Sequence, residues 1–120
     1  MAADLARHPR FRWQPGMAYF LDGERHRMVG DSPSASLLSF GVLDLTDDAT
    51  AGILLALAAA AAPRRLEIHI GGTVAGCRIR MLGRHKSPAR PREQQSSWTG
   101  DTLGAACAAA LISLWSHDGR

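Results

Sequence analysis

Aromatic residues are scarce in this chain of 120 residues, which contains three Phe, three Trp and one Tyr. Leu, Ile, Val, Met and Ala must therefore fill most of its interior. Cysteine is scarcer still: only Cys77 and Cys107 are present, in apolar surroundings and without the CxxC or Cys/His spacing of a zinc site. Two cysteines so placed argue against a disulfide framework and predict buried, reduced thiols.

Long apolar runs are missing as well. The longest one, residues 49–62, is shorter than the roughly 20 residues that a membrane span requires. The first ten residues lack the apolar segment of a secretory signal. We therefore expect a soluble, cytoplasmic protein that does not bind membranes.

Patterns typical of catalysis or metal binding are also absent. The five histidines, at positions 8, 26, 69, 85 and 117, form no HxH, HxxxH or HExxH spacing. Residues 71–76 are glycine-rich but lack the Lys-Ser/Thr ending of a phosphate-binding loop. Asp47 and Asp48 are better explained as residues that begin a helix than as an acid–base pair. We expect no enzymatic activity, no cofactor and no metal ion.

The strongest helix signal lies between Asp47 and Pro63, where alanine and leucine predominate. Thr46, Asp47 or Asp48 can accept hydrogen bonds from the first turn, and Pro63 ends the helix. Gly52 costs about 1 kcal/mol relative to alanine inside a helix, which predicts close packing against a neighbour at that position.

A second helix is predicted to begin near Thr99 or Asp101. Its apolar residues recur at helical spacing and form one stripe: Leu103, Cys107, Ala110, Leu111, Leu114 and Trp115. Because both helices carry small residues and few charges, we expect them to touch each other closely. Leu54 and Leu57 of the first helix should be buried against Ile68, Ile79 or Leu111.

Two β-hairpins are predicted. Asp22-Gly23 separates residues 17–21 from residues 25–29, and Asp-Gly is a strong hairpin signal because both residues tolerate positive φ. In the second hairpin apolar residues alternate with polar ones in residues 65–70 and 77–81, which leaves one face exposed to water. Residues 37–43 fit a short strand or an extended packing segment.

These elements predict an α+β fold: an antiparallel sheet built from the two hairpins, with the two alanine-rich helices on one face, in the order ββ(β)αββα. The length suits a single domain over residues 1–120. Within it, residues 1–10 are expected to be frayed, and residues 83–97 to form a basic loop.

Basic side chains carry the hypothesis for a functional surface. If the hairpins share one sheet, arginines of both strands and of the loop face the same side and can bind phosphate groups or an acidic protein. The alternative is a solvated face neutralised by Asp22, Glu24 and Glu67. The candidate partner-binding residues are Arg25, Arg27, Arg78, Arg80, Arg84, Lys86, Arg90 and Arg92.

Residues 45–57, Leu-Thr-Asp-Asp-Ala-Thr-Ala-Gly-Ile-Leu-Leu-Ala-Leu, resemble a helix of small uncharacterised phage and prophage proteins. Those proteins carry Asp-Leu-x-Asp-Pro-Ala-Thr-x-Gly-x-Leu-Leu-Ala-Leu, preceded by an aromatic-Pro-Gly-Met stretch and followed by a hairpin and a final helix. Here Asp48 replaces the proline, and Ser97-Trp98-Thr99-Gly100 replaces the usual opening of the last helix. The resemblance implies a phage origin and no chemistry.

Together these features predict a small phage-type accessory or host-takeover protein that acts by stoichiometric binding to a host protein, with a bacterial defence complex as one class of target. The alternative is an accessory protein that binds nucleic acid through the same arginines. Oligomeric state cannot be read from the sequence.

Overall fold

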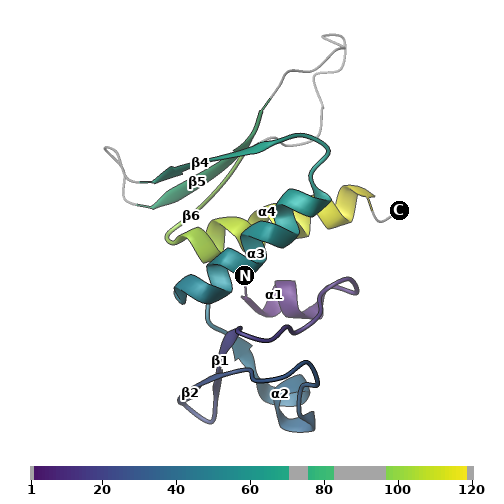
Figure 1. The fold of residues 1–120 in the computed structure, drawn as a ribbon, viewed down its shortest axis with the longest axis vertical. Helices are drawn as coiled ribbons and strands as arrows, with labels where there is room; N and C mark the ends of the chain where they lie inside the picture. Colours follow the sequence, from purple (N-terminus) through teal and green to yellow (C-terminus); the bar gives the residue numbers. More distant parts are fainter. Residues whose placement is uncertain (1, 71–75, 83–96, 119–120) are drawn as a thin grey trace.

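The computed structural model describes residues 2–70, 76–82 and 97–118, and its α+β class agrees with the prediction (Figure 1). The elements are, in chain order, α1 (Ala2–Arg7), β1 (Ala18–Leu21), β2 (Glu24–Arg27), α2 (Ala35–Phe40), β3 (Val42–Leu43), α3 (Asp48–Ala61), β4 (Leu66–Ile70), β5 (Cys77–Met81), β6 (Ser97–Gly100) and α4 (Leu103–Asp118).

The two hairpins do not share one sheet, and here the structure corrects the expected arrangement. Strands β2-β1-β3 form one antiparallel sheet, sheet A, and β4-β5-β6 form another, sheet B. Each hairpin recruits its own third strand, because β3 pairs with β1 and β6 pairs with β5. Helices α3 and α4 cross the middle of the molecule, with the sheets at opposite ends (Figure 1).

The first hairpin forms as predicted. Asp22 and Gly23 both have positive φ, 54° and 80°, as a two-residue turn of the primed type requires. Residues 35–43 form a helical turn and a two-residue strand rather than one extended segment. Ser34 begins that helix, because its hydroxyl accepts from the Leu37 backbone N–H at 3.1 Å.

Helix α3 begins and ends where the sequence predicts, with Asp47 as its N-cap and its last helical residue two positions before Pro63. Leu54 is fully buried, and Leu57 is half-buried at the rim of the same core. The expectation for Gly52 is wrong, since a Cβ there would meet no atom within 4 Å. The close approach occurs instead at Gly104 of α4, where a Cβ would collide with the Leu45 carbonyl oxygen.

The N-terminal segment is ordered, not frayed as expected. Residues 2–7 form α1, whose Leu5 is completely buried and which packs on α4. The His8 ring lies 5.2 Å from the ring of Trp115. Burial of Leu5, with Ala2 and Ala6 of the same helix packed against the core, holds α1 in place.

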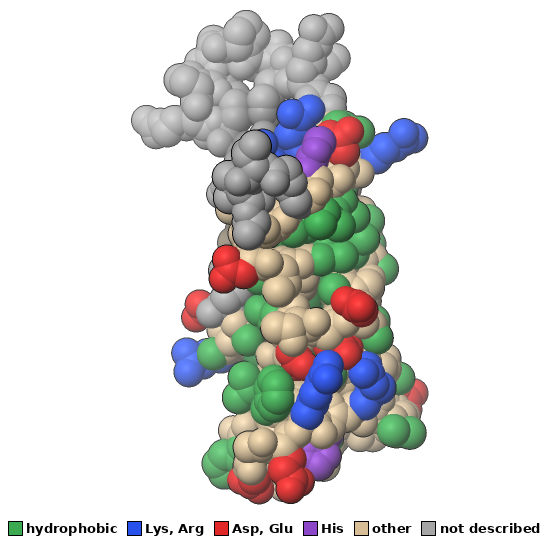
Figure 2. All heavy atoms as spheres, turned by 90° about the vertical axis from the view of Figure 1, so that its left-hand side faces the viewer, with side chains coloured by type: hydrophobic (Ala, Val, Ile, Leu, Met, Phe, Trp, Pro, Cys, Tyr) green, Lys and Arg blue, Asp and Glu red, His purple; other side chains and the backbone are tan. Residues whose placement is uncertain are grey.

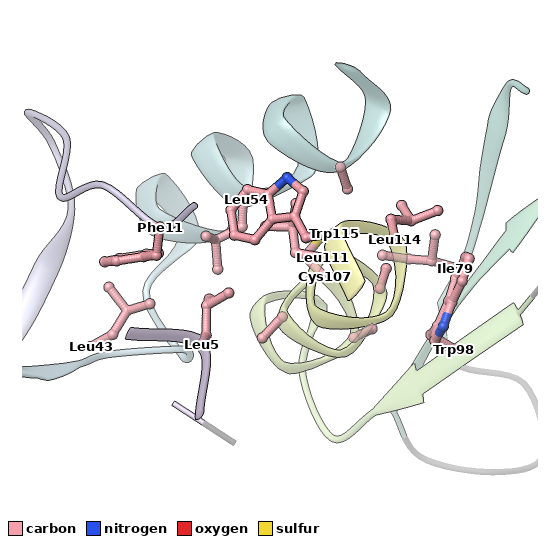
Figure 3. Close-up of a cluster of buried hydrophobic side chains, with 14 of the residues drawn as sticks. Leu5, Phe11, Leu43, Leu54, Ile79, Trp98, Cys107, Leu111, Leu114 and Trp115 are labelled. Carbon is pink, nitrogen blue, oxygen red and sulfur yellow. The ribbon is translucent and has the colours of Figure 1, made fainter. Parts of the chain in front are cut away.

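The core runs from α1 through α3 and α4 to the inner face of sheet B (Figure 3). The predicted stripe of α4 is buried apart from half-buried Leu103, and α3 packs along this helix as expected. Ile79 and Trp98 point from sheet B toward α4 (Figure 3). Trp98 thus belongs to β6, which the sequence did not predict. Of the expected basic loop of residues 83–97, Ser97 belongs to this strand, and residues 83–96 lie outside the described residues.

Both cysteines are free and buried, as predicted. Cys107 has no exposed surface, and burial raises the pKa of its thiol to about 12. Burial raises the pKa of the Cys77 thiol as well. Neither thiol therefore ionises near neutral pH, and both serve as small apolar side chains.

Candidate functional site

The eight predicted partner-binding residues fall into three groups. Arg25 and Arg27 lie on β2 of sheet A, and Arg78 and Arg80 lie on β5 of sheet B. The other four, Arg84, Lys86, Arg90 and Arg92, lie outside the described residues. The expectation that the first two pairs share one surface is wrong, because the sheets are separate and the helices stand between them.

Arg25 and Arg27 form ion pairs with two buried carboxylates, Asp44 and Asp47. Arg27 grips Asp47 with both terminal nitrogens, Nη1 to Oδ2 at 3.0 Å and Nη2 to Oδ1 at 2.8 Å. Arg25 Nη2 donates to the same Oδ1 at 2.9 Å. These contacts attach strand β2 to the first turn of α3. They also neutralise the charge of the two arginines within the chain.

Asp47 is the centre of this network. Its Oδ2 also accepts from the backbone N–H and the hydroxyl of Thr50, each at 2.9 Å. Hydrogen bonds from Arg27, together with those from Thr50, hold the pKa of Asp47 well below its usual range, although burial acts in the opposite direction. Thr50, itself buried, accepts from the backbone N–H of Ala18 at 2.8 Å and so links β1 to α3.

Asp44, which is 3% exposed, is the second buried carboxylate. Its Oδ1 accepts from the backbone N–H and the hydroxyl of Thr46, at 3.0 and 2.6 Å. Arg25 Nε lies 2.9 Å from Asp44 Oδ2, an ion-pair contact outside hydrogen-bond alignment. A helix needs only one N-cap carboxylate, yet Asp44 and Asp47 lie within four residues of each other. The additional carboxylate is the feature of the sequence that could have indicated an internal ion pair.

Arg78 and Arg80 are exposed on the outer face of β5, where the alternation placed them. The register sets Arg80 opposite Glu67 and Arg78 opposite His69, so the four side chains share one face as predicted. Within that face Glu67 Oε1 lies 2.7 Å from His69 Nε2 and accepts its hydrogen bond, and Arg80 Nη2 lies 3.8 Å from Glu67 Oε1. These charged and histidine side chains gather at the upper end of the molecule (Figure 2).

An exposed apolar surface was not predicted. Phe20 and Val42 face each other across β1 and β3, and Leu38 and Phe40 belong to the adjoining α2. The exposed fractions are 39% for Phe20, 51% for Val42, 62% for Leu38 and 73% for Phe40. We call these four residues the Phe40 patch. Of the segment Leu-Leu-Ser-Phe, Leu37 alone is buried.

Three other aromatic residues lie at this end of the molecule. Phe11 is buried, whereas Trp13 and Tyr19 are half-buried. These three rings and the ring of His26 form a row in the order Phe11, Trp13, Tyr19, His26. The distances between neighbouring ring centroids are 5.3, 5.9 and 5.4 Å. The rings therefore pack chiefly on one another across the face of sheet A opposite Arg25 and Arg27.

Among residues 2–70, 76–82 and 97–118, no three His, Cys, Asp or Glu side chains are grouped to hold a metal ion. In the same part of the chain no helix combines the length and the apolar character needed to cross a membrane. Comparison with protein-family models, curated proteins and solved structures gives no match.

Proposed function

We propose that this chain is a non-catalytic protein that acts by stoichiometric binding to another protein through the Phe40 patch. The observation that carries the proposal is the exposure of Leu38 and Phe40, both more than 60% accessible to solvent. Large apolar side chains that are exposed on neighbouring elements of a small protein are typical of interaction surfaces, since their burial in a complex removes apolar area from water.

The surroundings of the patch suit an interface. Its members lie on β1, α2 and β3, and β1 is fastened to α3 through the bond from Ala18 to Thr50. A pre-ordered surface loses little conformational entropy on binding. Arg25 lies opposite Phe20 in the strand pair, so a polar rim adjoins the apolar centre.

The class of partner rests on the resemblance of residues 45–57 to a helix of small phage and prophage proteins. On that basis the chain is a phage-type accessory or host-takeover protein, its partner is a protein of the bacterial host, and a defence complex is one class of target. Its place of action is then the host cytoplasm.

Replacing Leu38 and Phe40 together by serine should strongly weaken partner capture without unfolding the protein. Both side chains are exposed, so the denaturation midpoint should change little. Central aromatic anchors dominate binding energy, and we expect at least about tenfold weaker capture from bacterial lysate, measured by quantitative pull-down.

Val29→Ser is the matched control, because Val29 is 90% exposed and lies outside the patch. It should bind like the unmodified protein. Equal capture by the Leu38/Phe40 variant and by the control would contradict the proposal.

A nucleic-acid-binding role is the second candidate, favoured by the two exposed guanidiniums of Arg78 and Arg80 on one strand face. On this hypothesis, the double variant Arg78→Ser/Arg80→Ser should bind generic DNA or RNA several-fold more weakly in a gel-shift assay, and its affinity should depend less on salt. The variant should still fold, since neither side chain belongs to the core. The charge-matched control is Arg7→Ser with Arg12→Ser, two exposed arginines of the N-terminal segment, outside sheet B. No shift at low salt, or equal loss in the control, would exclude this role for the β5 face.

A further inference from the structure

Strand β4 lies at an edge of sheet B, where β5 is its only strand neighbour among the described residues (Figure 1). The other sheet edges are protected. Strand β2 carries Glu-Arg-His-Arg, all exposed, β3 has two residues, and β6 is polar apart from Trp98. Charged or short edge strands resist pairing with another chain. Strand β4 instead presents Ile68 and Ile70, with exposed fractions of 36% and 74%.

The hydrogen-bond phase of the ladder shows which backbone groups of β4 face the open edge. The Leu82 backbone N–H donates to the Arg65 carbonyl at 2.7 Å. Hydrogen-bonded and non-hydrogen-bonded pairs alternate in an antiparallel ladder, so Glu67 and His69 also direct their N–H and C=O groups to β5. The outward groups are those of Leu66, Ile68 and Ile70.

We propose that a second copy of this chain pairs with that edge, β4 against β4, to join two copies of sheet B into one continuous antiparallel sheet. A two-fold axis through Ile68 places Ile68 opposite Ile68 of the partner copy and Leu66 opposite Ile70. These are the residues with outward backbone groups, and each such pair exchanges two hydrogen bonds. The strand sequence Leu-Glu-Ile-His-Ile is compatible with this symmetry.

The same register places a carboxylate opposite an imidazole, a hydrogen-bond acceptor opposite a donor. Glu67 of one copy falls opposite His69 of the other, twice by symmetry, on the outer face of the joined sheet. These are non-hydrogen-bonded pairs, in which side chains approach most closely. On the inner face Ile68 lies beside Ile79, and α4 packs on β5 and β6. The isoleucines of β4 therefore lie beyond the part of sheet B that α4 covers. The partner strand would remove part of their apolar surface from water.

This self-association is independent of the proposed function, because the Phe40 patch lies on sheet A. Analytical ultracentrifugation of the full chain over a concentration series should give a species of twice the 12.9 kDa chain mass. A charge swap then tests the register. His69→Glu should oppose Glu67 of the partner and weaken the dimer by about tenfold, and Glu67→His should weaken it through opposed histidines. The double variant Glu67→His/His69→Glu restores both pairs and should restore the dimer.

His26→Glu on the β2 edge is the matched control and should leave the dimer unchanged. A monomeric wild-type protein at all concentrations overturns the proposal, and so does a dimer that loses stability with His26→Glu but not with His69→Glu.

A second measurement does not depend on the charged pair. Ile68→Cys places a thiol opposite its own symmetry mate and should yield a covalent dimer under mild oxidation, whereas Val29→Cys should not. Equal yields from the two variants overturn the proposal.

Discussion

Asp47→Ala should lower the free energy of unfolding by about 3 kcal/mol. The substitution removes the N-cap of α3 and leaves Arg27 without its bidentate partner and the hydroxyl of Thr50 without its acceptor. Removing one member of a buried ion pair costs about 3–5 kcal/mol, and the half-exposed arginines reduce that range because they regain water. Urea denaturation followed by tryptophan fluorescence measures the loss.

Asp48→Ala is the matched control. Asp48 is the first helical residue and exposed, so its loss removes only a favourable interaction with the helix dipole, about 0.3–1 kcal/mol. Equal losses in the two variants would mean that the arginines contribute nothing to the fold and remain available to a partner.

The same carboxylate should make stability depend on acid. Its pKa is lower in the folded state than in the unfolded chain, where aspartate titrates near about 3.9. The stabilisation is therefore fully present above that pH and is lost as the pH falls toward the folded pKa. The range from about pH 5 to pH 3 spans the titration of an unfolded aspartate. Over this range the free energy of unfolding should fall more for the wild-type protein than for Asp47→Ala. Parallel curves for the two proteins would contradict the ion pair.

Gly104→Ala is the second substitution with a large expected effect. Its Cβ would collide with the carbonyl oxygen of Leu45 and lie 2.9 Å from the carbonyl carbon. Both atoms belong to the backbone, and Leu45 is also fixed by the bond from Thr102 Oγ1 at 2.9 Å. Overpacking a fixed site costs about 1–3 kcal/mol or more, and a clash with backbone falls at the upper end.

Gly52→Ala makes the same chemical change in the other long helix and should have the opposite sign. Nothing lies within 4 Å of the added methyl group, so the variant should gain about 0.5–1 kcal/mol from reduced backbone entropy. Thermal denaturation of the two variants side by side measures both effects. A stabilised Gly104→Ala would show that α4 does not approach residue 45 as described.

Local signals predicted local structure. Asp47 and Pro63 set the bounds of α3, and Asp22-Gly23 set the first turn, because capping and turn chemistry act within a few residues. The alternation around Ile79 gave the inner face of β5 for the same reason.

Pairings between distant segments could not be predicted in this way. Strand β6 exists because Trp98 pairs with Ile79, nineteen residues earlier in the chain, and its own four residues carry no strand pattern. The division into two sheets likewise depends on which third strand each hairpin recruits. Burial of Leu5 depends on α4, more than ninety residues away.

The candidate site was misjudged for the same reason. Arginines on a strand look alike in sequence whether they face water or a carboxylate. Arg27 is separated from Asp47 by 20 positions, and only the folded chain brings them to 2.8 Å. The basic surface therefore loses two of its predicted members to the fold, while Phe40, which had been assigned no role, becomes the most exposed member of an apolar patch.

The most direct measurement of the proposed function is site-specific photo-crosslinking in bacterial cells. A photoreactive phenylalanine analogue is placed at position 40 in one protein and at position 29 in another, both highly exposed sites. We expect one discrete adduct with a single protein partner from position 40 and none from position 29. Equal labelling from the two positions, or an adduct from position 29 alone, would contradict the assignment of binding to the Phe40 patch.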